Sequence, residues 1–168
     1  MAVVNRNSTS IANAVAEPIV LNSPINGYAE QREVSGVIAS ATTDDATSIG
    51  RFHRIPSNAR VSQVLLHCLL ATTAGAIDIG IYDTADNGGA VVDADFFASA
   101  LALTTPDKLN LDVTFESGVY TVVNADKALW QALGLTVDPK KDYDVAYTIT
   151  TTFNGGPTAI GLRTRFVI

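Results

Sequence analysis

The sequence has little of what most reactive or membrane-bound proteins require. Only 17% of its 168 residues are charged, one is cysteine and two are histidine. The single thiol, Cys68, excludes an internal disulfide and a thiolate metal cluster, and its apolar surroundings predict a small core side chain. Long apolar runs are also missing, and the start MAVVNRNSTS lacks the basic-then-apolar layout of a signal peptide. We therefore expect no membrane partner and synthesis in a cytoplasm.

Clustered positive charge is missing as well. The net charge is −6 and no block of consecutive Lys or Arg occurs, whereas binding to phosphates needs several clustered cations, so we expect no nucleic-acid partner. The low charge content predicts an apolar surface that meets another protein, unless neutral polar residues simply cover the outside of a β-rich domain. Arg51, Arg54 and Arg60 lie close in sequence and form a weak candidate for a protein-binding site.

Catalytic motifs are absent from the sequence. A two-histidine metal centre or a Ser-His-Asp triad would have to use His53 or His67, and both lie among apolar residues, which is typical of packing. No Gly-x-Ser-x-Gly, His-Glu-x-x-His or Gly-x-x-x-x-Gly-Lys phrase occurs. We therefore expect that the protein is not an enzyme and uses no cofactor.

Two binding chemistries remain as alternatives. Oxygen ligands for calcium gather within thirteen positions, but their spacing differs from that of an EF-hand, and turn formation explains them more simply. Aromatic residues could line a sugar-binding face, which would make the chain a carbohydrate-binding module, although packing inside the domain is the simpler role. The calcium group is Asp83, Asp86, Asn87, Asp93 and Asp95, and the aromatic group is Tyr82, Trp130, Tyr143 and Tyr147.

Residues 28–168 show alternating apolar and polar positions separated by Gly-rich turns, which predicts about eight strands. The resulting fold class is all-β, an antiparallel two-sheet β-sandwich of jelly-roll kind with one short helix. The helix is expected between Asn124 and Gly134, and residues 96–103 fit either a strand or a turn. We expect strands over 32–39, 48–55, 61–70, 77–82, 118–124, 143–151 and 158–168, with hairpins joining 61–70 to 77–82 and 143–151 to 158–168.

Residues 1–27 have a different composition and form an expected extended N-terminal arm. They contain only two charges, Arg6 and Glu17, and Pro18 and Pro24 favour extended chain. Such a segment gains order by lying on a neighbouring surface, although it could also be a loose terminus or the first strand of the domain. The candidate partner contacts are its apolar residues Val3, Val4, Ile11, Val15, Ile19, Val20, Leu21 and Ile25.

Two further phrases stand out in the sequence, FHRIPSNARVSQVLL at 52–66 and GAIDIGIYDTADNGGAVVDADFFAS at 75–99. Both resemble small structural proteins of tailed-bacteriophage virions, whose better-understood relatives are capsid decoration (cement) proteins. The resemblance implies a location on the capsid surface, with the major capsid protein and further copies of the chain as partners, in a homodimer or homotrimer. A tail or baseplate protein of the same virion is the alternative.

Overall fold

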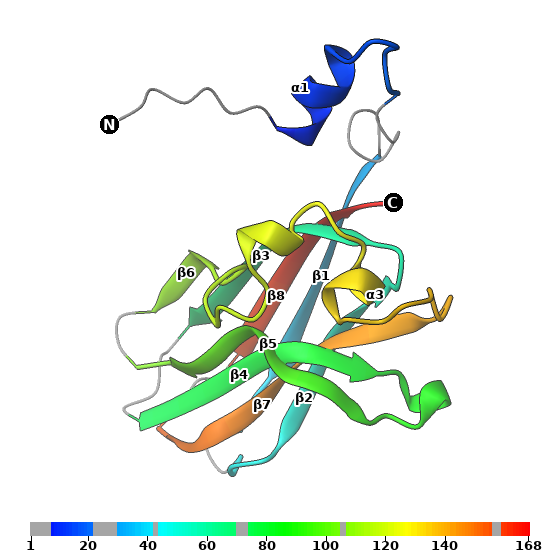
Figure 1. Cartoon of the computed structure of the whole chain (residues 1–168). Coiled ribbons are helices and arrows are strands. Elements are labelled where there is room, and N and C mark those ends of the chain that lie inside the picture. Colours follow the sequence, from blue (N-terminus) through cyan, green and yellow to red (C-terminus); the bar gives the residue numbers. More distant parts are fainter. Residues whose placement is uncertain (1–7, 22–29, 42–43, 70–73, 105–106, 156–158) are drawn as a thin grey trace.

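The computed structural model describes residues 8–21, 30–41, 44–69, 74–104, 107–155 and 159–168, and these form two antiparallel four-stranded sheets packed face to face (Figure 1). One sheet has the order β1 (Gln31–Ala39), β8 (Ala159–Val167), β3 (Arg60–Leu69), β6 (Lys108–Asp112). The other has the order β2 (Ile49–Pro56), β7 (Asp142–Asn154), β4 (Ala74–Asp83), β5 (Val91–Ala102). Consecutive strands change sheets everywhere except between β4 and β5, which is a jelly-roll arrangement. The all-β sandwich expected from the sequence is confirmed.

The alternating pattern places one face of each central strand in the core. On β3 this face includes Leu66 and Cys68, and on β4 it includes Ile77 and Ile79, all fully buried. Cys68 is thus the small core side chain that the sequence predicts. The expected strands 32–39, 48–55 and 61–70 match β1, β2 and β3 within a residue or so, and the ambiguous segment 96–103 belongs to β5.

Both expected hairpins are wrong. Residues 61–69 belong to β3, which pairs with β8 and β6, whereas the strand that contains 77–82 lies in the opposite sheet. In the same way β7 pairs with β2 and β4, while β8 pairs with β1 and β3. In each case the two strands turn their apolar faces toward each other across the core instead of lying side by side.

The outer face of β4 is also drier than its sequence indicates. Tyr82 alternates with the core isoleucines, yet it is fully buried. The Arg51 guanidinium lies 5.5 Å from the centre of its ring, and its hydroxyl lies 2.5 Å from Oγ1 of Thr148 on β7. Long side chains from neighbouring strands therefore cover this face.

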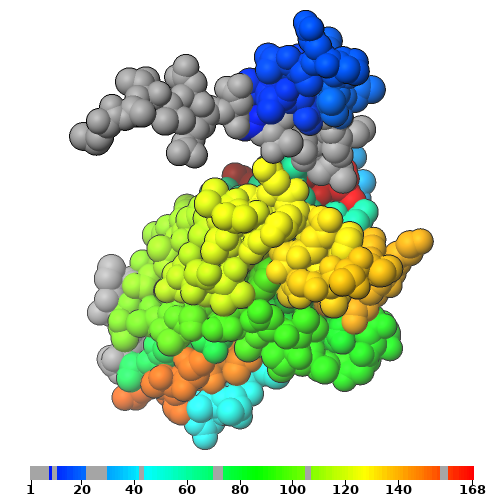
Figure 2. Space-filling view, in the orientation of Figure 1, coloured from blue at the N-terminus to red at the C-terminus, as the bar shows by residue number. Residues whose placement is uncertain are grey.

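The connection from β6 to β7, residues 113–141, contains no strand, so the strand expected over 118–124 is wrong. It holds a 3-10 turn, η2 (Val122–Asn124), and one four-residue helix, α3 (Leu129–Ala132), which is the only helical part of the segment between Asn124 and Gly134. Tyr120 anchors the connection, because it is buried and its hydroxyl donates to the Val61 carbonyl at 2.7 Å. Figure 2 shows this connection, yellow to orange, as a continuous cover over part of the sandwich.

The N-terminal arm contains a second short helix, α1 (Thr9–Ala14), which the sequence pattern does not indicate. Its N-cap is Ser8, whose side chain accepts a hydrogen bond from the Ile11 amide. Figure 1 shows α1 beyond the end of the sandwich at which β1 begins and the chain ends. None of the helices in the described part of the chain is long and apolar enough to cross a membrane.

Candidate partner-binding surface

The described part of the arm presents apolar side chains to solvent. Ile11, Val15, Ile19, Val20 and Leu21 are 52%, 67%, 70%, 49% and 89% exposed. The backbone hydrogen bonds found in the arm join residues 8 to 20 to one another. Each of these five side chains is therefore about half exposed or more. The other three candidate contacts, Val3, Val4 and Ile25, lie outside the described residues.

Arg51 is engaged inside the fold. Its guanidinium donates to the Asp144 carboxylate at 2.9 Å, to the Asp83 carbonyl at 2.9 Å and to the Gly89 carbonyl at 2.8 Å. These bonds tie β2 to β7 and to both ends of the loop between β4 and β5. Arg51 thus has a structural role in the folded chain, and its role at a partner surface remains a prediction.

The other two candidate arginines do not form one cluster with Arg51. Arg54 shares Asp144 with it, donating to the second carboxylate oxygen at 3.0 Å, and lies 3.5 Å from Asp86. Arg60 lies 3.8 Å from Asp126 on the β6–β7 connection. The structure brings together Arg51 and Arg54 only, and as partner contacts Arg54 and Arg60 also remain predictions.

The β6–β7 connection also carries exposed apolar side chains, some of them within residues 118–124, which were expected to form a strand. Val122 and Val123 are 75% and 72% exposed. The sequence indicates part of this exposure, because Val122 and Val123 are adjacent and a strand turns adjacent side chains to opposite faces, so only one of them could face a given core. The exposed apolar side chains of this connection are Phe115, Val119, Val122, Val123, Leu135 and Val137.

The two histidines lie apart. His53 Nε2 lies 2.9 Å from Oγ1 of Thr164, so the contact joins β2 to β8 across the sandwich, and burial lowers the pKa of His53 to about 4. His67 lies on the outer side of β3, and its buried Nε2 has no hydrogen-bond partner in the described chain. Within the described residues no three His, Cys, Asp or Glu side chains converge as a metal site requires.

Three side chains of the oxygen-rich segment at the end of β4 and in the loop after it form contacts within the fold. Asp83 binds the Lys141 ammonium at 2.5 Å, Asp86 lies near Arg54, and Asn87 donates to the Thr84 hydroxyl at 2.9 Å. The loop is closed by η1 (Ala85–Asn87) and by glycine in the left-handed conformation directly after it. Asp83, Asp86 and Asn87 are thus engaged within the fold, and no group of three metal-ligating side chains forms among the described residues, so the arrangement favours turn formation over the calcium alternative.

Most of the aromatic residues that could have formed a sugar-binding face are buried. Tyr82, Tyr143 and Tyr147 are each at most 3% exposed, and only Trp130 is partly accessible. Sugar-binding sandwiches need aromatic rings that are free to stack on a ligand, and buried rings cannot do so. The carbohydrate-binding alternative therefore has no platform among these four residues.

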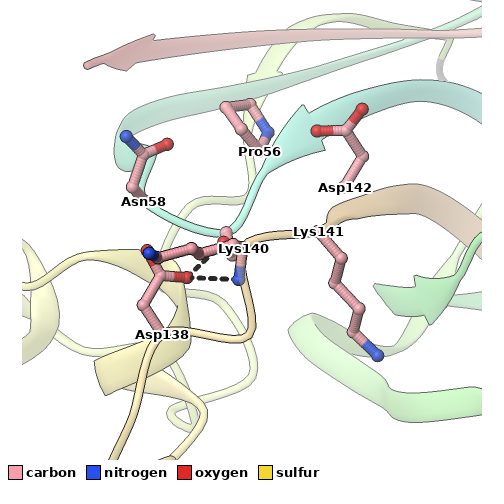
Figure 3. Close-up of a pocket in the computed structure, with 7 residues that line it drawn as sticks. Pro56, Asn58, Asp138, Lys140, Lys141 and Asp142 are labelled. Carbon is pink, nitrogen blue, oxygen red and sulfur yellow. Dashed lines mark hydrogen bonds between the residues drawn. The ribbon is translucent and has the colours of Figure 1, made fainter.

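A shallow hollow of about 240 Å³ lies between the end of β2 and the start of β7 (Figure 3). Asp138 at its side accepts a hydrogen bond from Ser57 at 2.5 Å and one from the Lys140 amide at 2.9 Å, and these bonds lower its pKa. Figure 3 shows the Lys141 side chain pointing away from the hollow, toward the strand that carries its partner Asp83. The polar groups of the hollow are thus largely used in hydrogen bonds and ion pairs within the fold.

Comparisons with known proteins complete the description. No protein-family model matches the chain, and no curated protein does. A solved structure described as "Cyanophage Pam1 capsid asymmetric unit" is similar over 91% of this chain and 96% of the other, with 14% sequence identity and a TM-score of 0.48. A likeness of this degree leaves the function to be argued from the residues themselves.

Proposed function

We propose that this chain is a capsid decoration protein of a tailed bacteriophage, a non-enzymatic protein that binds the outside of the icosahedral head and bridges neighbouring major capsid protein subunits. The observation that carries the proposal is the arm, whose described apolar side chains are about half exposed or more. Covering apolar surface is favourable by roughly 25 cal/mol per Å², so such a segment favours a partner surface. The resemblance of residues 52–66 and 75–99 to phage virion proteins supplies the class of partner.

The proposed mechanism is stabilisation by binding. Confined DNA pushes a filled head outward, and a protein that contacts two shell subunits at once binds only the assembled state, so it shifts the equilibrium toward assembly. Symmetric copies on a closed shell, and self-association of the sandwich, multiply a modest contact through avidity. The sandwich is then the rigid support, and the arm makes the binding contacts with the shell.

The test uses full-length protein and purified heads that lack it. Ile19→Asp with Leu21→Asp places two charges on arm residues that are 70% and 89% exposed, so folding is unaffected while docking into an apolar surface is disfavoured. We expect binding about tenfold weaker or worse, measured by co-sedimentation across a concentration series.

The matched control carries the same changes elsewhere. Val91→Asp with Leu109→Asp alters two residues of the sandwich strands that are 52% and 63% exposed. It should load close to wild type. Equal loading of the arm variant and the wild type at half-saturating concentration would show that the arm is not the binding element.

A further inference from the structure

Four strands form the edges of the two sheets, and three of these edges are poorly suited to accept another strand. The β6 strand has only five residues, and Asn110 within it has a φ of 54°. The β2 strand ends at Pro56 and shifts register against β7 between Arg51 and His53. Short strands, proline and bulges are the features by which sheet edges avoid unwanted pairing.

The β5 edge is covered by the chain itself. The Ser117 amide donates to the Phe97 carbonyl at 3.0 Å, and the Tyr120 amide donates to the Phe96 carbonyl at 3.1 Å. The Ser99 amide, further along the strand, donates to the Glu116 carboxylate at 2.9 Å. The β6–β7 connection thus occupies the backbone groups that another strand would use.

The β1 edge has none of these features. Its nine residues pair with β8 without a single register shift, from Gln31 with Val167 to Ala39 with Ala159. It contains no proline and no residue with positive φ, and no strand of the described chain pairs with its other side. Its charges lie near its start, and Val37 is 75% exposed. A long, regular, open edge of this kind is a template for strand addition.

We propose that the free edge of β1 pairs with β1 of a second copy, antiparallel and about a two-fold axis, so that the two four-stranded sheets continue into one another. The register that we propose places Gly36 opposite Gly36. Val34 then faces Ile38 of the second copy on the core side, and Ser35 faces Val37 on the outer side. Val34 and Ile38 are only partly buried and already pack on the core, so this register extends the apolar layer across the junction.

The second copy fits this edge for two reasons. Glu33 lies opposite Ala39 in this register, so no like charges face each other across the pair. A two-fold pairing also covers the open β1 edges of both copies at once. The assembly therefore closes at two copies and leaves no free β1 edge from which a fibre could grow. Antiparallel β1 strands begin at opposite ends of the junction, so the two arms leave in opposite directions. That last consequence alone rests on the proposed function, since it suits a protein that bridges separate neighbours.

The test is the oligomeric state of the purified full-length chain, measured by sedimentation equilibrium between about 1 and 100 µM, a range that brackets ordinary interface affinities. The expected result for wild type is a species of twice 17.7 kDa. Ser35→Lys with Val37→Lys puts lysine opposite lysine at two symmetric places, and we expect dissociation to rise about tenfold or more. Ser35→Lys with Val37→Glu puts opposite charges at the same places and should keep the dimer.

The outcomes are separated by controls on the same chain. Val137→Lys adds a lysine at an equally exposed position away from β1 and should leave the dimer intact. A melting curve for each variant shows that it is folded. Wild type that is monomeric or trimeric throughout the range would overturn the proposal, and so would a dimer that the double-lysine variant leaves unchanged. None of these measurements involves heads, so they fail or succeed independently of the proposed function.

Discussion

The buried His53 predicts that the stability of the protein depends on pH in a range where few other groups titrate. The folded chain holds the pKa of His53 at about 4, because burial disfavours the imidazolium, whereas an unfolded chain protonates histidine near 6.5. The depressed value means that the unfolded state binds more protons between these limits. The free energy of unfolding is therefore highest above pH 7 and falls as the pH drops toward 4.

The magnitude follows from proton linkage. Integrating the difference in bound protons between pH 7 and pH 5 at about 1.4 kcal/mol per tenfold change gives a loss of about 2 kcal/mol. Glu33, Asp45, Asp112 and Asp138 have lowered pKa values in the folded state, and they lose their contribution only below about pH 5. Asp93, whose pKa burial raises, contributes in the opposite sense, but it is the same in wild type and in a His53 variant, so the difference between the two proteins reports on the histidine.

Urea unfolding followed by the fluorescence of the single tryptophan, Trp130, measures this difference. The matched variant is His53→Gln, because a glutamine amide can still reach the Thr164 hydroxyl that the imidazole contacts but does not titrate. Wild type should lose about 2 kcal/mol more than the variant between pH 7 and 5. Parallel curves for the two proteins would refute the claim that burial holds this histidine neutral.

Three further predictions test the packing. Gly80→Ala should lower the free energy of unfolding by about 3 kcal/mol, because a Cβ at this position would lie 2.0 Å from a backbone oxygen of β5. In the same urea titrations the control Gly161→Ala should change the free energy of unfolding by less than about 1 kcal/mol, because the nearest atom to its Cβ would lie at 3.5 Å. Cys68 should resist a thiol reagent at pH 8 until the protein is unfolded, since burial raises its pKa to about 11, and rapid labelling of folded protein would contradict its core position. Arg51→Met should destabilise the fold by about 2 kcal/mol and Arg54→Met by under about 1 kcal/mol, because the first side chain holds three partners and the second is 51% exposed; equal losses on thermal melting would count against the clamp.

The parts of the fold that could be predicted from the sequence are those that depend on local alternation. Residues 61–70 reveal β3 because every second side chain enters the core, and the same rule finds β1 and β2. Which strands pair is not a local property, since strands of both sheets share one pattern. For that reason the two expected hairpins are wrong although all four of their strands are present.

The connection between β6 and β7 shows a different limit. Residues 118–124 are rich in β-branched and aromatic side chains, as strands are, but Tyr120 is used to anchor a loop and Val122 is left exposed. The exposed apolar surface of this connection therefore escapes a propensity argument. The apolar residues of the arm were identifiable because composition changes sharply after residue 27, while their surroundings on a partner depend on a second molecule.

The central claim is that the N-terminal arm binds the capsid shell. Electron cryo-microscopy of heads saturated with the full-length chain tests this most directly. We expect density for the sandwich repeated over the shell, with residues 8–21 lying on a capsid subunit beside the one that supports the sandwich. Density confined to the tail vertex, or an arm folded onto its own sandwich, would contradict it.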